Sequence, residues 1–149
     1  MQHGDHDSAT SGSEYFFNPR SIAIVGASDH KKKPGGRPLA SLIERGYPGK
    51  IFPINPRYEE LAGRRCYPTV LDVPDAIDMA IVSVPAVAVL EVLEQCAKKG
   101  VRAAVVFSAG FGEVGAEGEA EQEKIRKLAR ESGMRVLGPN CFGIMNVKN

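Results

Sequence analysis

The chain has 149 residues, of which 43% are hydrophobic and 25% are charged, and its formal net charge at pH 7 is +1. This composition is typical of one globular domain with a sizeable core, and the near-zero charge argues against a nucleic-acid partner. The apolar stretches are shorter than the roughly 20 residues that cross a membrane, so no membrane segment is expected.

Residues 1–14 are polar and lack the apolar segment of a signal peptide. We expect them to be a disordered tail, followed by one domain over residues 15–149. The three cysteines, Cys66, Cys96 and Cys141, are odd in number and lack the paired spacing of a zinc site. They favour a reducing, cytoplasmic location over a disulfide framework, and Cys96 is expected in the core.

Strand-like and helical patterns alternate along the rest of the chain. Apolar runs predict strands over residues 22–25, 50–54, 64–67, 79–84, 101–107 and 135–137, with 64–67 a short edge strand. Helical periodicity covers residues 38–45, 87–99 and 119–132. This alternation predicts an α/β fold of a single domain. The fold would be Rossmann-like and doubly wound, with a mainly parallel sheet and helices on both faces.

A glycine corner follows the first strand and predicts a phosphate site. Gly26 allows a sharp turn, and Gly35 and Gly36 open a helix whose positive end favours an anion. The spacing differs from a dinucleotide fingerprint, and the second strand ends in Asn55-Pro56-Arg57 without the usual acid. Arg57 would suit a phosphate on the ribose, as in NADP or in coenzyme A. A purely structural turn is the alternative.

Four loops with small residues follow predicted strands, over residues 26–36, 84–86, 108–111 and 138–141. In an open parallel sheet, ligands bind at the carboxyl ends of the strands, where the strand order reverses. Because turns favour Gly, Pro, Ser and Asn for their own geometry, a structural origin of this pattern also stays open.

Five motifs, in this order, resemble the CoA-binding domain of NDP-forming acyl-CoA synthetases. They are Ser-Ile-Ala-Ile-Val-Gly-Ala-Ser at 21–28, Pro-Ile-Asn-Pro at 53–56, Val-Pro-Ala at 84–86, Ser-Ala-Gly-Phe-Gly-Glu at 108–113 and Leu-Gly-Pro-Asn-Cys-Phe-Gly at 137–143. This superfamily includes ADP-forming acetate–CoA ligases, the succinyl-CoA synthetase alpha subunit and bacterial protein acetyltransferases. The succinyl-CoA synthetase pattern Thr-Gly-x-x-Gly is replaced here by Gly-Ala-Ser and a longer lysine-rich loop, which favours the ligase or acetyltransferase branch.

The resemblance implies coenzyme A or acyl-CoA as the ligand and assigns a part of it to each loop. The first loop would hold the ADP part, with Lys33 the lysine expected there, and Arg57 would approach the 3′-phosphate. Val84 and Pro85 would pack on the adenine or upper pantetheine, and the last two loops would line the pantetheine arm. The implied cofactor-binding residues are Gly26, Ala27, Ser28, Lys33, Gly35, Gly36, Asn55, Pro56, Arg57, Val84, Pro85, Ser108, Ala109, Gly110, Phe111 and Asn140.

No catalytic or metal-binding set is evident in the sequence. His3, His6 and His30 have no expected buried partner, Cys141 is expected to be a packed residue, and Glu113 is expected in a solvated turn. In the resembled synthetases, other domains supply the phosphorylated histidine and the nucleotide site. We therefore expect a binding domain from the N-terminal part of a larger enzyme, whose downstream domains are its partners. The alternatives are a stand-alone CoA-binding regulatory protein and an NADP-binding oxidoreductase domain.

Overall fold

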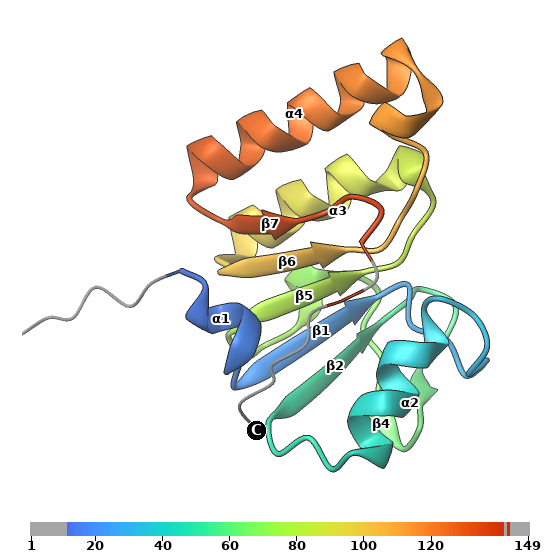
Figure 1. The fold of residues 1–149 in the computed structure, drawn as a ribbon. Coiled ribbons are helices and arrows are strands. Elements are labelled where there is room, and N and C mark those ends of the chain that lie inside the picture. Colours follow the sequence, from blue (N-terminus) through green and yellow to red (C-terminus); the bar gives the residue numbers. More distant parts are fainter. Residues whose placement is uncertain (1–11, 142, 144–149) are drawn as a thin grey trace, which may run out of the picture.

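Five parallel strands form the central sheet of the computed structural model, which describes residues 12–141 and 143 (Figure 1). The strands are β1 (Ser21–Val25), β2 (Lys50–Ile54), β5 (Met79–Val82), β6 (Ala103–Val106) and β7 (Arg135–Leu137), in the spatial order β2-β1-β5-β6-β7. The order reverses between β1 and β5, so the chain winds from the centre of the sheet to one edge and then to the other. This confirms the predicted doubly wound fold.

Helices cover both faces of this sheet (Figure 1). They are α1 (Glu14–Phe17), α2 (Gly36–Glu44), α3 (Ala86–Lys99) and α4 (Ala116–Ser132), with short 3₁₀ turns at η1 (Val70–Asp72) and η2 (Gly112–Val114). Side chains alternate along β1, so Ala23 and Val25 pack in the core under α3 and α4, while Ile22 and Ile24 pack in the core under α1 and α2. The sheet is therefore buried between two apolar layers.

Burial on both faces explains why the strands are visible in the sequence as continuous apolar runs. Every residue of β1, β5 and β6 is buried, and these are the three central strands. Cys96 lies in the core as predicted, and its burial raises the pKa of its thiol to about 12. That thiol is therefore a packed, unreactive group at neutral pH.

Several predicted boundaries differ from the structure by one to three residues. Helix α4 begins at Ala116 rather than at residue 119, α2 begins at Gly36 rather than at 38, and β6 is limited to Ala103–Val106. Helix starts are poorly marked here because neither α2 nor α4 has a side-chain N-cap hydrogen bond.

The edge strand predicted over residues 64–67 is only partly present. Arg64–Arg65 forms β4, which pairs antiparallel with β3 (Glu60–Leu61) in a separate two-stranded sheet. Tyr67 makes one isolated parallel bridge to Ile54 of the main sheet. The tight turn between β3 and β4 gives the segment a local partner, so it does not extend the main sheet.

Part of the predicted N-terminal tail is ordered in the structure. Residues 12–14 form a turn and the start of α1, because Tyr15 and Phe16 pack against the sheet. Residues 1–11 of that predicted tail lie outside the described residues.

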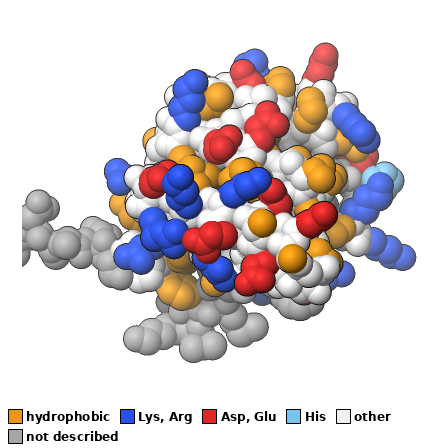
Figure 2. Space-filling view, turned by 90° about the horizontal axis from the view of Figure 1, so that it is seen from above, with side chains coloured by type: hydrophobic (Ala, Val, Ile, Leu, Met, Phe, Trp, Pro, Cys, Tyr) orange, Lys and Arg blue, Asp and Glu red, His pale blue; other side chains and the backbone are white. Residues whose placement is uncertain are grey.

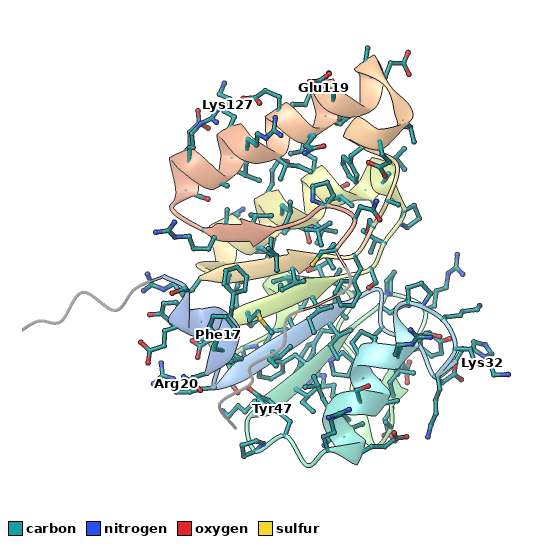
Figure 3. All side chains as sticks on the ribbon, in the orientation of Figure 1. Phe17, Arg20, Lys32, Tyr47, Glu119 and Lys127 are labelled. Atoms are coloured by element: carbon teal, nitrogen blue, oxygen red, sulfur yellow. The ribbon has the colours of Figure 1, made fainter. Side chains whose placement is uncertain are left out.

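The outer surface over α4 carries mixed charge. Figure 2 shows acidic and basic side chains interspersed across the face seen from above, and Glu119 and Lys127 project outward from α4 in Figure 3. Glu123 pairs with Arg126 at 3.2 Å and with Arg130 at 3.0 Å.

Within the described part of the chain, no helix is long and apolar enough to cross a bilayer.

Candidate functional site

The carboxyl ends of four strands meet at one edge of the sheet and enclose a continuous groove. A hollow of about 650 Å³ lies over the ends of β1, β2 and β5, and a second of about 420 Å³ extends toward the end of β6. The two hollows share the lining residues Gly26, Ser28, Lys33, Ser83, Val84 and Pro85. We call the combined space the rim groove, and it crosses the point where the strand order reverses.

Most of the predicted binding residues line the rim groove. They are Gly26, Ser28, Lys33, Gly35, Asn55, Pro56, Arg57, Val84, Pro85, Ser108 and Ala109. Asn140 lies beside this set, since its backbone N–H donates to the carbonyl of Ser108 at 2.9 Å. Tertiary structure thus brings together segments that are separated by more than 100 positions in the sequence, from Gly26 to Asn140.

Four predicted residues occupy other positions. Ala27 and Phe111 are buried, at 0% and 2% exposure, and belong to the two core layers. Gly36 packs against the backbone of His30 beneath the first loop. Gly110 lines a neighbouring hollow at the start of α3 and α4, next to Ala86. These four residues support the loops of the groove from below or beside it.

The glycine corner is built by close contact between backbone segments. Gly26 has a φ of 85°, and a Cβ at this position would overlap the carbonyl oxygen of Ser83. A Cβ at Gly35 would overlap the carbonyl oxygen of Gly26, so the start of α2 rests directly on the corner. Both glycines therefore have a structural role in bringing the first turn of α2 against the groove.

Two backbone amides of this corner are engaged within the fold. The N–H groups of Gly26 and Ala27 both donate to the carbonyl of Ile54, at 2.9 and 3.3 Å. On the same loop, the Ser28 hydroxyl accepts a hydrogen bond from the N–H of His30 at 3.1 Å and keeps its own hydrogen for donation. Ser28 and Lys33 are thus the side chains of this loop that can bind an anion in the groove.

Asn55 holds three segments of the rim together. Its side-chain amide donates to the carbonyl of Ala27 at 2.8 Å, and its side-chain oxygen accepts the N–H of Arg57 at 3.0 Å. Its backbone N–H donates to the carbonyl of Tyr67 at 2.9 Å. The first glycine loop, the end of β2 and the chain after β4 are therefore fixed to one another by a single residue.

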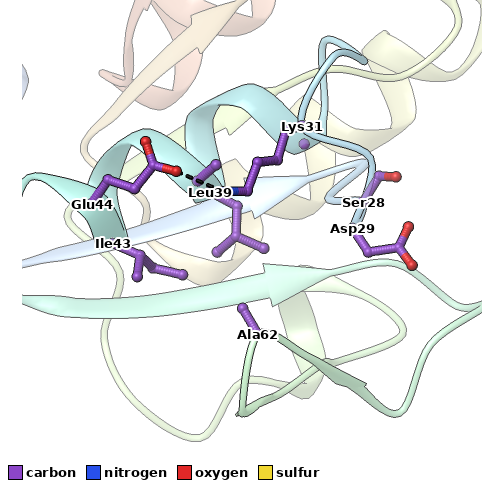
Figure 4. Close-up of a pocket in the computed structure, with 9 residues that line it drawn as sticks. Ser28, Asp29, Lys31, Leu39, Ile43, Glu44 and Ala62 are labelled. Atoms are coloured by element: carbon purple, nitrogen blue, oxygen red, sulfur yellow. Dashed lines mark hydrogen bonds and ion pairs between the residues drawn. The ribbon is translucent and has the colours of Figure 1, made fainter.

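The lysines of the first loop point in different directions. Lys31 pairs with Glu44 of α2 at 2.7 Å, across a separate hollow on the outer side of the loop (Figure 4). Lys32 projects away from the sheet at the tip of the loop (Figure 3). Lys33 lines both parts of the rim groove. Arg57 is the other basic residue in the lining, at the end of the groove over β2.

The opposite end of the groove is fixed by hydrogen bonds that involve the side chains of Ser108, Glu113 and Gln122, of which only Gln122 was not named from the sequence. The Ser108 hydroxyl donates to the carbonyl of Val84 at 2.5 Å, which joins the loops after β5 and β6. The N–H of Gly110 donates to a carboxylate oxygen of Glu113 at 2.6 Å, and the N–H of Gly112 donates to Gln122 at 3.1 Å. The predicted solvated turn at Glu113 is exposed, yet its carboxylate organises the loop.

A family model described as a CoA binding domain matches residues 20–147. The chain belongs to this family. It is 46% identical over 134 residues to subunit alpha of acetate–CoA ligase [ADP-forming] II from Pyrococcus furiosus. This match covers 89% of this chain and 29% of that protein. It is 47% identical over 133 residues to the acetate–CoA ligase [ADP-forming] of Methanocaldococcus jannaschii. This match covers 89% of this chain and 18% of that protein.

The solved structures agree with this assignment. The dinucleotide forming acetyl-coenzyme A synthetase 1 of Ca. Korarchaeum cryptofilum, in complex with phosphate and ADP, superposes with a TM-score of 0.83 at 50% identity. The match covers 88% of this chain and 28% of that one. The family confirms coenzyme A as the ligand of this domain. The chain spans less than a third of the length of these relatives.

His30 and Cys66 do not line the rim groove of this CoA-binding domain. His30 is exposed and lies 3.7 Å from Asp29, while His3 and His6 are outside the described residues. Cys66 is buried and directs its sulfur to the carbonyl of Asn55 at 3.5 Å, and its burial raises the pKa of its thiol. Among the described residues, no group of three His, Cys, Asp or Glu could hold a metal ion.

The loop at Gly110 in this CoA-binding domain is expected to loosen in acid. Hydrogen bonding from the N–H of Gly110 holds the pKa of the Glu113 carboxyl below its ordinary value of 4.5. A lowered pKa in the folded state means that the bond stabilises the loop above pH 4.5 and that this contribution disappears as the pH falls through the lower, folded value. NMR titration of the Gly110 amide should show its shift following that pKa. The Glu113→Gln variant should remove the transition, and an unchanged titration in that variant would contradict this role.

Proposed function

We propose that this domain supplies the coenzyme A site of a larger, ADP-forming acid–CoA ligase and performs no turnover by itself. The observation that carries the proposal is the continuous rim groove, lined by small residues over four strand ends, with two basic side chains in its lining. Its similarity over nine tenths of the chain to ADP-forming acetate–CoA ligases supports the choice of reaction class. A cytoplasmic location fits this proposal, since Cys66, Cys96 and Cys141 are free thiols.

The residues present suit the shape and charge of coenzyme A. The nucleotide end would lie over Asn55 and Pro56, with the Arg57 guanidinium near the 3′-phosphate. The diphosphate would lie over the first loop, where Ser28 and Lys33 line the groove and the start of α2 adds its positive end. The planar guanidinium of Arg57 suits the terminal 3′-phosphate, and the flexible ammonium of Lys33 suits the diphosphate at the other end of the nucleotide.

The pantetheine arm would continue across the second part of the groove. Val84 and Pro85 offer apolar contact, and Ser108 and Ala109 keep the passage shallow. A long and partly apolar arm needs such a channel of small residues more than it needs a deep pocket. The arm would end near Gly110 and Asn140, where the thiol can meet groups supplied by other parts of the larger enzyme.

Calorimetric titration with coenzyme A, dephospho-CoA and NADP tests this proposal. We expect coenzyme A to bind and to raise the melting temperature roughly with the logarithm of its concentration above the Kd, and NADP to do neither. Arg57→Ala should weaken coenzyme A binding by about 10-fold and leave dephospho-CoA binding unchanged, because one charge-assisted contact contributes about 1.5–3 kcal/mol and Arg57 is exposed. Lys32→Ala is the matched control, since Lys32 projects away from the sheet. Equal losses for both ligands would remove Arg57 from the 3′-phosphate site.

The ligase assignment needs a separate test with the complete protein. We expect acetyl-CoA, ADP and inorganic phosphate to be converted to acetate, coenzyme A and ATP. Transfer of the acetyl group to a lysine-containing protein, without ADP, would favour the acetyltransferase alternative. Coenzyme A binding without either reaction would favour the regulatory alternative.

A further inference from the structure

One face of α3 lines the part of the rim groove that lies over β1, β2 and β5. Its members are four residues at helical spacing, Ala88, Glu91, Val92 and Gln95. Positions i, i+3, i+4 and i+7 lie on one side of a helix, so these side chains form a continuous strip along the groove. We call them the α3 strip. None of the four belongs to a loop that follows a strand, and none was expected in the site from the sequence.

The α3 strip combines apolar and polar side chains. Ala88 and Val92 are half-buried and offer apolar contact. Pro68 and Thr69, from the segment that follows β4, line the same hollow. Its volume of about 650 Å³ is in the range of ligand-binding clefts. Apolar contact beside polar groups is the environment in which proteins bind a planar base.

Glu91 is the unexpected member of the strip. Among the described residues that line the rim groove, it is the one acidic side chain, and it lines the same hollow as Lys33 and Arg57. Coenzyme A carries its negative charge on its 3′-phosphate and its diphosphate, so a carboxylate beside either group would weaken binding. A carboxylate suits this ligand where it faces a hydrogen-bond donor, and the exocyclic amine of adenine is such a donor.

Gln95 adds the second group that adenine requires. Its side-chain amide donates to Oε1 of Glu91 at 3.4 Å, which is longer than an ordinary hydrogen bond of about 2.7–3.2 Å. This bond uses one amide hydrogen of Gln95 and one carboxylate oxygen of Glu91, so each side chain keeps a further group for a ligand. The pair offers a donor next to an acceptor, which complements the amine of adenine and its neighbouring ring nitrogen.

We propose that Glu91 and Gln95 read the base of coenzyme A and select adenine over guanine. This inference rests on the proposed function, because it places the base at the end of the groove that contains Arg57. The ring lies against Ala88 and Val92, and its amine donates to Glu91. Guanine has a carbonyl oxygen in place of this amine, and the carboxylate repels that oxygen.

Titration with coenzyme A and with 1,N6-etheno-CoA tests this assignment. The etheno bridge removes both hydrogens of the amine and leaves the phosphates and the pantetheine arm unchanged. The wild-type chain should bind the etheno analogue at least about 10-fold more weakly, because a hydrogen bond to a charged group is lost. In Glu91→Ala the ratio of the two affinities should fall below about 3-fold, and Gln95→Ala should also lower it. Glu94→Ala is the matched control, since Glu94 is exposed on the same helix and does not line the groove. It should keep the wild-type ratio.

Adenosine 3′,5′-bisphosphate and guanosine 3′,5′-bisphosphate provide a second readout without the pantetheine arm. The wild-type chain should bind the adenosine compound at least about 10-fold more tightly, and Glu91→Ala should lose most of this preference. Equal affinity of the wild type for the two nucleotides, or an unchanged etheno ratio in Glu91→Ala, would overturn the assignment while coenzyme A binding persists. A wild-type chain that bound no coenzyme A would instead overturn the proposed function together with this inference.

Discussion

Gly26→Ala is expected to remove a large part of the stability of the domain and to weaken coenzyme A binding. The new Cβ would overlap the carbonyl oxygen of Ser83, and the residue would have to keep a φ of 85° that costs a non-glycine residue about 1–2 kcal/mol. Backbone groups cannot rotate away as a side chain does, so the overlap adds about 1–3 kcal/mol or more. The sum is a large part of a typical total stability of about 5–15 kcal/mol.

A variant at a second glycine, Gly100, separates the cost of the positive φ from the cost of the overlap. Gly100 has a φ of 84° and no atom within 4 Å of its Cβ position, so Gly100→Ala carries the backbone strain without the overlap. Urea unfolding should show a loss of about 1–2 kcal/mol for Gly100→Ala and more than about 3 kcal/mol for Gly26→Ala. Gly100→Ala should bind coenzyme A with wild-type affinity. Similar losses in both variants would show that the contact between the glycine corner and Ser83 is unimportant.

Asn55→Ala is expected to have the second largest effect, on both stability and binding. It removes the donor to the carbonyl of Ala27 and the acceptor for the N–H of Arg57, and it leaves both backbone groups without these partners. The partly buried bond to Ala27 contributes about 1–1.5 kcal/mol and the exposed bond from Arg57 about 0.5 kcal/mol, so we expect a loss of about 1.5–2 kcal/mol. Affinity for coenzyme A should fall by at least about 10-fold, because the rim loops lose their common support.

Two further variants separate support from direct contact. Asn55→Asp keeps the acceptor for Arg57 but loses the donor to Ala27, and it places a carboxylate against that carbonyl, so it should be at least as destabilising as Asn55→Ala. Arg57→Ala should weaken coenzyme A binding while leaving urea unfolding unchanged. If Asn55→Ala unfolded at the wild-type urea concentration, the side chain would have no role in holding the rim together.

Local apolar patterns explain how well the elements could be predicted. The strands β1, β5 and β6 are buried on both faces, so each appears as an uninterrupted apolar run in the sequence. The stripe of Val89, Leu93 and Cys96 identified α3 in the same way. The prediction over residues 64–67 was two residues too long and missed the partner strand β3, because two-residue strands in a hairpin leave no periodicity to detect.

The candidate site could be predicted from sequence only as a set of segments. The small residues that follow each predicted strand indicated that the loops lie at one rim of the sheet, and the resemblance of the motifs indicated coenzyme A as the ligand. The role of each residue within those loops depended on its distant neighbours. Lys33 lines the rim groove, whereas Lys31 is turned to the outer side of the loop, where it pairs with Glu44. Phe111 belongs to the core because its ring is covered by other buried side chains.

The sequence by itself determined the order of the elements, the rim on which the loops gather and the family of the ligand, because these depend on local periodicity and on motif order. Only the tertiary structure decided which polar groups face the groove. The amides of Gly26 and Ala27 are engaged by the carbonyl of Ile54, almost thirty positions away, and the side chain of Asn55 reaches back to Ala27. Hydrogen bonds form between groups that are close in space, whatever their separation along the chain. Their partners can therefore be identified only from the folded structure.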